Sequence, residues 1–243
     1  TMATQLLIKS FQLDKLTYAM MILIALSLIL PSIAHAKRYA TKAYCNDPDY
    51  KCVKVKRGQS WKSLFKDPVE RDIVMRLNRV NGNPWGGQTI VIPRDMSSKD
   101  HLDYAPFPRA VDVIGKNTVV VFPSELAWAA YDKHGHLVHW GPMSGGKNWC
   151  ADTREKCRTV NGMFEVYRKG GGGCKSRKFH GAPMPYCMFF KGGFAMHGSK
   201  TVPGYHASHG CVRMYTKDAK WLNRNFVTLP KDGGTNVIVG GYN

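Results

Sequence analysis

The thiol of Cys211 is the side chain in this sequence best suited to covalent chemistry. It stands in the segment Ser208-His209-Gly210-Cys211, directly after a glycine, and His206 lies close by. A free cysteine with a pKa of roughly 8.5 carries little thiolate at neutral pH, and a neighbouring imidazole that accepts its proton overcomes this limit. The small Gly210 leaves room for backbone N–H groups around a developing oxyanion. These residues predict a nucleophilic cysteine with a histidine base.

His197 is the predicted base. It lies fourteen positions before Cys211 and is followed by Gly198. His209 is a less favoured base, since it can also hydrogen-bond within the turn or touch substrate. A zinc site is a further alternative, but one turn that carries three of four ligands cannot readily supply tetrahedral geometry, so we expect no metal and no cofactor. The ligands of that alternative would be His197, His206, His209 and Cys211.

The sequence around these residues resembles the L,D-transpeptidase (YkuD-type) catalytic family of bacterial cell-wall enzymes. The segments Met196-His197-Gly198-Ser199 and Ser208-His209-Gly210-Cys211-Val212-Arg213-Met214 are similar to its histidine and cysteine signatures. An upstream stretch, Thr159 to Phe164, is also similar, although Val160 stands where the family usually has proline. The resemblance covers about residues 117–240.

The resemblance implies a β-rich fold and a set of site residues. Cys211 would attack the carbonyl of an L-centre in a wall tetrapeptide, His197 would be the base, and the carbonyl of Gly198 would orient the imidazole. Arg213 carries a planar guanidinium that suits a substrate carboxylate or a structural ion pair. The implied substrate-binding residues are Ser208, His209, Gly210, Arg213 and Tyr186.

Residues 1–36 have the pattern of a secretory signal peptide. Lys9 and Lys15 precede an apolar run from Leu16 to Leu30, and Ala34-His35-Ala36 has the form of a cleavage site. The run is shorter than the roughly 20 residues that a spanning helix needs, which favours cleavage over a membrane anchor. We therefore expect an exported chain in the periplasm or cell wall that does not span the membrane after cleavage.

The chain is strongly basic, with a formal net charge of +18 over 243 residues. Residues 1–36 carry one net positive charge, which leaves +17 on the mature chain. Such a balance can indicate nucleic-acid binding. The anionic polymers outside the cytoplasm are envelope components instead, so we expect retention near the wall and no nucleic-acid partner.

Seven cysteines in an exported chain predict disulfides and one free thiol. Six cysteines allow 15 pairings, and proximity along the chain only suggests one of them. That pairing leaves Cys211 free for chemistry and joins Cys45 with Cys52, Cys150 with Cys157, and Cys174 with Cys187.

The part before the catalytic region divides into three segments. Residues 37–52 form an N-terminal arm, and residues 53–93 have a β-α-α-β pattern that resembles a LysM module. This resemblance implies binding of N-acetylglucosamine-containing glycans; the alternative is a structural cap that binds nothing. Residues 94–116 are a polar, proline-containing linker, which predicts that the two units fold independently.

Residues 117–243 are predicted as the catalytic domain. Several short strands with Gly and Pro turns indicate a mainly β domain, sandwich or barrel-like. One helix is expected after the cysteine motif, with Thr216 as its N-cap. Residues 168–187 are expected to form an active-site flap that a Cys174–Cys187 disulfide tethers. The expected strands lie within 119–122, 126–131, 136–140, 162–167, 187–190, 194–196 and 237–239.

Three functions remain open at this point. The first is a peptidoglycan L,D-transpeptidase that passes the acyl group from a thioester to an amine of another stem peptide or an outer-membrane protein. The second is an L,D-carboxypeptidase or hydrolase with the same site and water as acceptor. The third is a non-catalytic wall-binding adhesion or invasion factor. The expected partners are peptidoglycan stem peptides and glycan strands.

Overall fold

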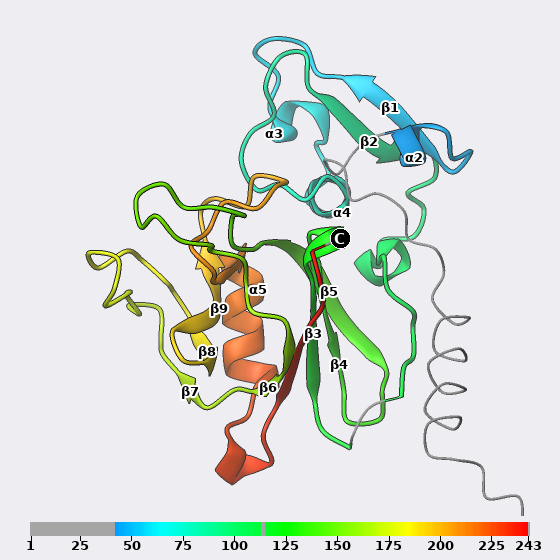
Figure 1. Ribbon diagram of the computed structural model, residues 1–243. Coiled ribbons are helices and arrows are strands. Elements are labelled where there is room, and N and C mark those ends of the chain that lie inside the picture. The colour runs from blue at the N-terminus through cyan, green and yellow to red at the C-terminus, as the bar shows by residue number, and fades with distance from the viewer. Residues whose placement is uncertain (1–41, 113–114, 243) are drawn as a thin grey trace, which may run out of the picture. The chain divides into compact units, whose positions relative to one another are not determined.

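A small β-α-α-β unit begins the described part of the chain (Figure 1). The computed structural model describes residues 42–112 and 115–242, so the expected signal peptide lies outside the described residues. Strand β1 pairs antiparallel with β2, with Tyr50 opposite Pro93. The elements are α2 (Lys42–Cys45), β1 (Tyr50–Lys54), α3 (Trp61–Leu64), α4 (Pro68–Leu77) and β2 (Thr89–Pro93).

The two helices of this unit begin where their sequences place capping residues. The Ser60 hydroxyl accepts a hydrogen bond from the Ser63 N–H, and the Ser63 hydroxyl accepts one from the Ser60 N–H, so both orphan donors are satisfied. Asp67 caps α4 through the N–H of Val69, and Pro68 occupies the first turn. The unit then buries its own small core, which includes Val55, Trp61, Val74, Ile90 and Ile92.

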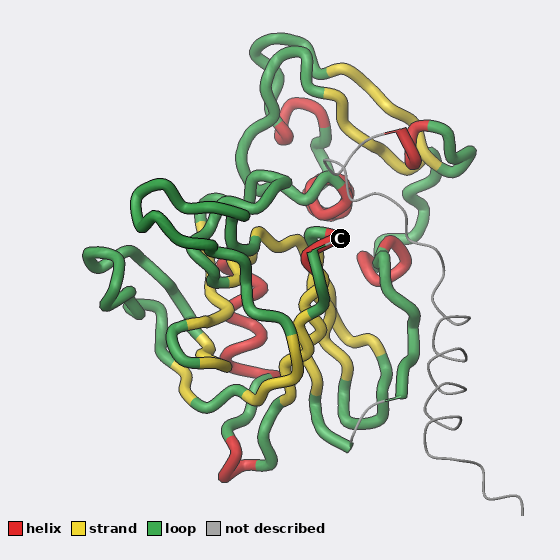
Figure 2. Tube along the Cα trace, in the orientation of Figure 1, coloured by secondary structure: helices red, strands yellow, loops and turns green. Residues whose placement is uncertain are grey.

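The second part of the chain is one mixed sheet of nine strands that curls into a half-barrel (Figure 2). The mainly β expectation is confirmed, and the arrangement is a single curled sheet rather than a two-sheet sandwich. The order across the sheet is β6-β11-β3-β4-β5-β10-β9-β8-β7. The strands are β3 (Thr118–Phe122), β4 (Ala127–Tyr131), β5 (Leu137–Ser144), β6 (Gly162–Glu165), β7 (Arg168–Lys169), β8 (Met188–Lys191), β9 (Phe194–Ser199), β10 (Val212–Tyr215) and β11 (Asn236–Val239).

Helix α5 (Thr216–Trp221) lies in the hollow of this sheet and continues into a π-helical turn, Leu222–Phe226 (Figure 1). Ala219, Leu222 and Phe226 pack against buried residues from both ends of the sheet, as the apolar spacing predicts. Thr216 was expected to be the N-cap, but it is the first helical residue and Tyr215 occupies the cap position. Short 3-10 turns lie at His101–Tyr104, Pro123–Glu125 and Pro230–Asp232.

Three disulfides are present, and they confirm the pairing that proximity suggested: Cys45–Cys52, Cys150–Cys157 and Cys174–Cys187. Cys211 is the free cysteine among the described residues. No helix among the described residues is long and apolar enough to cross a membrane.

The β-α-α-β unit and the curled sheet share a buried ion pair. The guanidinium of Arg76 on α4 donates two hydrogen bonds of 2.8 Å to the carboxylate of Asp218 on α5, and a third to the carbonyl of Trp140. Both charged side chains are at most 3% exposed. The structure therefore differs from the expectation of two independent units, because the linker's composition carries no information about which charges face each other across the join.

Asp218→Ala is expected to lower the free energy of unfolding by about 3–5 kcal/mol, because it leaves the Arg76 charge buried without its partner. Denaturant titration of the full chain measures this. Glu70→Ala is the control, since it breaks only the exposed Lys99–Glu70 pair and should cost at most about 1 kcal/mol. Equal effects of the two substitutions would show that the buried pair does not hold the units together.

Candidate active site

The parallel pairing of β9 with β10 brings the candidate base and nucleophile to one face of the sheet. His197 on β9 is directly opposite Arg213 on β10. Cys211 lies two residues before Arg213, and side chains two apart along an extended chain point to the same face. The intervening residues Met196 and Val212 point the other way and are fully buried in the core. The alternation thus places the candidate catalytic side chains on one face of the sheet and the core side chains on the other.

The turn before β10 holds Cys211 through a network around Ser208. The buried Ser208 hydroxyl donates to the carbonyl of Cys211 at 2.5 Å and accepts from the N–H of Gly210 at 3.0 Å. That N–H is used within the turn, so it is not available to a developing oxyanion. Gly210 has a φ of +118°, and a Cβ there would lie 2.8 Å from the ring of Phe194. Glycine is therefore required for the turn's shape and for the close approach of the ring.

His197 is held in one tautomer by its neighbour. Its Nδ1 lies 2.9 Å from the carbonyl oxygen of Gly198, which can only accept a hydrogen bond, so Nδ1 carries the proton. Nε2 is then the atom with a free lone pair. A Cβ on Gly198 would lie 2.9 Å from the Cα of Thr216, so only glycine fits between β9 and α5. This geometry matches the role that the resemblance implied for Gly198.

Burial keeps both partners neutral at rest. The imidazole of His197 is 6% exposed, and desolvation lowers its pKa to about 4. Desolvation also raises the pKa of the Cys211 thiol above its ordinary value, against smaller effects of a hydrogen bond from the Ala195 backbone and of the Arg213 charge. The resting pair is therefore thiol and imidazole rather than thiolate and imidazolium.

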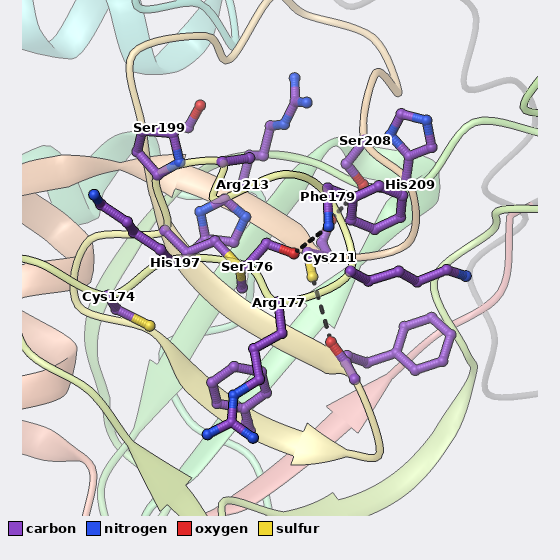
Figure 3. A pocket seen from close by; sticks show the side chains of 18 of the residues that line it. Cys174, Ser176, Arg177, Phe179, His197, Ser199, Ser208, His209, Cys211 and Arg213 are labelled. Atoms are coloured by element: carbon purple, nitrogen blue, oxygen red, sulfur yellow. Dashed lines mark hydrogen bonds between the residues drawn. The ribbon is translucent and has the colours of Figure 1, made fainter. Parts of the chain in front are cut away.

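A pocket of about 640 Å³ opens over these residues (Figure 3). Its floor comes from β9 and β10, and the flap between β7 and β8 covers it with residues such as Cys174 and Arg177. An ion pair between Lys178 and Glu155 at 2.9 Å and a hydrogen bond between Nε2 of His209 and the Asp152 carboxylate at 2.6 Å join the pocket rim to the Cys150–Cys157 loop. In the sequence, only its two cysteines marked this loop as an ordered segment.

The charge of the pocket is positive. Five cationic residues line it, and none of the described residues in its lining is acidic. Arg213 is half-buried beside Cys211, and its guanidinium makes no hydrogen bond or ion pair with any residue that the structure describes. An unpaired guanidinium at that depth favours a ligand carboxylate over the structural ion pair that the sequence left open. The cations are Arg168, Lys175, Arg177, Lys178 and Arg213.

Three other expected residues lie in different surroundings. His209 is at the pocket rim, packed on the ring of Phe179 with centroids 4.7 Å apart. Tyr186 is not among the residues that line the pocket; its ring packs beside Gly172 and under the guanidinium of Arg224. His206 accepts a hydrogen bond from the Gly145 N–H at 3.1 Å.

The four ligands of the zinc alternative do not come together in the described part of the chain. The one group there with suitable atoms consists of Cys150, Asp152 and His209. Cys150 is in a disulfide with Cys157, so its sulfur is not a thiolate ligand. The described residues therefore do not supply the four-ligand zinc set.

Comparison with known proteins identifies the family of this curled mixed sheet, in which His197 lies on β9 and Cys211 directly precedes β10. A model of the YkuD family, described as the L,D-transpeptidase catalytic domain, matches residues 116–239. The chain belongs to this family. No curated protein matches the chain.

A solved structure from Xylanimonas cellulosilytica shares this fold. An L,D-transpeptidase structure from Xylanimonas cellulosilytica is 24% identical, with a TM-score of 0.54, and the match covers 77% of this chain and 97% of that one. An L,D-transpeptidase from Stackebrandtia nassauensis is 21% identical over 55% of this chain and 59% of its own, with a TM-score of 0.44. One from Mycobacterium tuberculosis is 18% identical over 51% and 57%, with a TM-score of 0.41.

The imidazole of His197 is expected to stay neutral until the pH falls to about 4, since burial disfavours the imidazolium. An ordinary histidine would protonate near 6.5. Below pH 4 the protonated ring cannot accept the thiol proton, so the rate of Cys211 acylation should fall there and not near pH 6.5. NMR titration of the ring, assigned by its loss in His197→Gln, measures the pKa. A midpoint above 6 would contradict the buried, desolvated state.

Proposed function

We propose that the protein is a peptidoglycan L,D-transpeptidase in which Cys211 is the nucleophile and His197 is the general acid and base. The observation that carries this proposal is the β9–β10 register, which places His197, with its fixed tautomer, opposite Arg213, two residues after the free thiol of Cys211 in a cationic pocket. Membership of an enzyme family that acts on peptidoglycan supports the substrate class.

In the first half-reaction, the sulfur of Cys211 attacks the L-centre carbonyl of a wall tetrapeptide. The thiol proton moves to Nε2 of His197 as the C–S bond forms, because the neutral resting pair requires proton transfer during attack. The C–N bond to the terminal D-alanine then breaks. His197 returns its proton to the departing amine, and an acyl-enzyme thioester remains.

In the second half-reaction, an acceptor amine attacks the thioester. His197 takes a proton from the amine, the C–S bond breaks, and the proton goes to the sulfur of Cys211. The products are a new amide and the original thiol. One imidazole with a fixed Nδ1–H serves both steps, since Gly198 keeps its ring orientation unchanged between them.

The charge of the pocket supports an anionic donor. A wall stem peptide carries several carboxylates, and the pocket offers Arg213 near the nucleophile with Lys175 and Arg177 on the flap. Arg213 also lowers the pKa of the Cys211 thiol through its charge, so it promotes nucleophile formation as well as binding. We assign the carboxylate of the departing D-alanine to Arg213.

The acceptor distinguishes the proposed function from its alternatives. An amine of another stem peptide gives a crosslink, an amine of an outer-membrane protein gives anchoring, and water gives an L,D-carboxypeptidase. Incubation of the protein with a disaccharide-tetrapeptide, followed by mass analysis, separates these outcomes. Crosslinked dimer supports the transpeptidase, a tripeptide without dimer supports the carboxypeptidase, and no turnover supports the non-catalytic wall-binding factor.

The N-terminal parts of the chain belong to the same proposal. Residues 1–36 are a signal peptide that exports the chain to the periplasm or cell wall. Residues 53–93 are a LysM-like module that binds glycan strands, residues 94–116 are a linker, and residues 117–243 are the catalytic domain. The order β1-α3-α4-β2 and the 64% exposure of Trp85, whose indole can stack on a sugar, support the module's role. Weaker pulldown of Trp85→Ala on purified peptidoglycan tests this assignment.

A carbapenem is expected to add one drug mass to the intact protein by acylating Cys211, because this is the free thiol in the pocket. Intact-protein mass spectrometry measures the adduct. Cys211→Ala should abolish it, whereas Ser98→Ala, outside the pocket, should leave it unchanged. An adduct that survives Cys211→Ala would exclude this residue as the nucleophile.

Arg213→Ala is expected to raise KM for the tetrapeptide donor by about 10- to 100-fold, since a charge-assisted hydrogen bond contributes about 1.5–3 kcal/mol. A donor whose terminal carboxylate is a carboxamide is the matched control and should lose little from the same substitution. Steady-state kinetics with the two donors measures the difference. Equal losses on both donors would show that Arg213 acts on the thiol and not on that carboxylate.

A further inference from the structure

The segment that follows β9 forms one wall of the active-site pocket. Ser199 and Thr201 line the pocket together with His197. The segment closes on itself, because the Ser199 hydroxyl accepts a hydrogen bond from the Thr201 N–H at 3.0 Å. Such a local turn does not determine where the wall stands relative to the nucleophile.

Asn81, in the loop after α4, makes the contacts that place this wall. Its side-chain amide donates to the carbonyl of Ser199 at 2.8 Å, and its side-chain oxygen accepts from the Val202 N–H at 2.8 Å. Its backbone N–H donates to the carbonyl of Val202 at 3.1 Å. One residue thus satisfies three polar groups of the wall over a sequence distance of more than a hundred residues.

The loop that carries Asn81 is itself fixed to the catalytic sheet. Val80 forms an isolated antiparallel bridge with Pro203, and its carbonyl accepts a hydrogen bond from the hydroxyl of the buried Tyr215 at 2.5 Å. Tyr215 ends β10, the strand that begins directly after Cys211. The Arg76–Asp218 pair anchors the preceding helix. Asn81 therefore holds the wall against a support that also carries the nucleophile strand.

We propose that Asn81 is a positioning residue for the proposed reaction, and that the loop after α4 supports the Ser199–Val202 wall of the pocket without itself lining the pocket. The family match begins at residue 116, so this contribution comes from outside the matched domain. The inference rests on the proposed function for its kinetic part, while its structural part, the placement of the Ser199–Val202 wall, stands independently.

The test uses the full chain and three variants. Asn81→Ala removes both side-chain hydrogen bonds. Asn81→Asp keeps the acceptor for the Val202 N–H and removes the donor to Ser199, at nearly constant volume. Asn83→Ala is the matched control, since Asn83 is an exposed residue of the same type two positions away.

Three readouts separate positioning from general stability. Hydrogen exchange at the Val202 amide reports whether the Ser199–Val202 wall is held in place, and it does so independently of any catalytic activity. Steady-state kinetics with the tetrapeptide donor reports substrate placement. Alkylation of Cys211 by iodoacetamide, a reagent too small to need the wall, reports the intrinsic reactivity of the thiol.

For Asn81→Ala we expect exchange at Val202 to become at least tenfold faster and kcat/KM for the donor to fall at least tenfold, mainly through KM. Alkylation of Cys211 should stay within twofold of the parent rate. Asn81→Asp should lower kcat/KM for the tetrapeptide donor to an intermediate extent and leave exchange at Val202 near the parent rate. Asn83→Ala should change neither exchange at Val202, nor the kinetics with the tetrapeptide donor, nor alkylation of Cys211. If Asn81→Ala has lost its cooperative unfolding transition, Asn81→Asp carries the test through its donor kinetics.

The proposal is overturned if exchange at Val202 is unchanged in Asn81→Ala, or if donor kinetics are unchanged while exchange rises. It is also overturned if alkylation and donor turnover fall in parallel, which indicates a general structural role. If the parent protein does not turn over the donor, the proposed function has failed, and exchange at Val202 alone then decides whether Asn81 holds the wall.

Discussion

The parallel pairing of β9 with β10 is the constraint on which the candidate active site depends. A single loop separates the two strands along the chain. Because the strands are parallel, the segment from Ser199 to Cys211 must cross back over the length of the strand. Register is strict in such a pair, because a shift of one residue would exchange the buried Met196 for His197 and move the base into the core. Burial of Met196 on one face of the sheet therefore determines the position of His197 on the other face.

The same burial that fixes the register determines the protonation states. Burial of these two groups disfavours both the imidazolium and the thiolate. Desolvation is the largest cause of the lowered pKa of His197 and of the raised pKa of Cys211. The fixed tautomer of His197 and the charge of Arg213 partly compensate, since they prepare the proton acceptor and stabilise the developing anion. The neutral pair keeps the free thiol unreactive at rest while leaving proton transfer available when a carbonyl is in place.

The sequence indicated Cys211 and His197 as candidates through their spacing, their glycine neighbours and the family resemblance around them. It indicated the three disulfides through proximity along the chain. It did not indicate all of the elements that support the candidate site. Strand β10 was missed because its four residues follow the motif directly and show no turn signal of their own. Tyr186 was expected in the cleft, but its backbone has a φ of +58° and its ring packs with Arg224.

The contacts of the β-α-α-β unit were not predictable because they join residues far apart in sequence. Arg76 and Asp218 are separated by 142 positions, and each is a charged residue of a kind that is common on the exposed face of a helix. A buried ion pair of this kind contributes little net stability compared with apolar packing, but it penalises every arrangement that separates its partners. Together with the amide of Asn81 it gives the N-terminal unit one orientation relative to the pocket. A polar linker supplies length, whereas these contacts join residues of the β-α-α-β unit to the catalytic sheet and to one wall of its pocket.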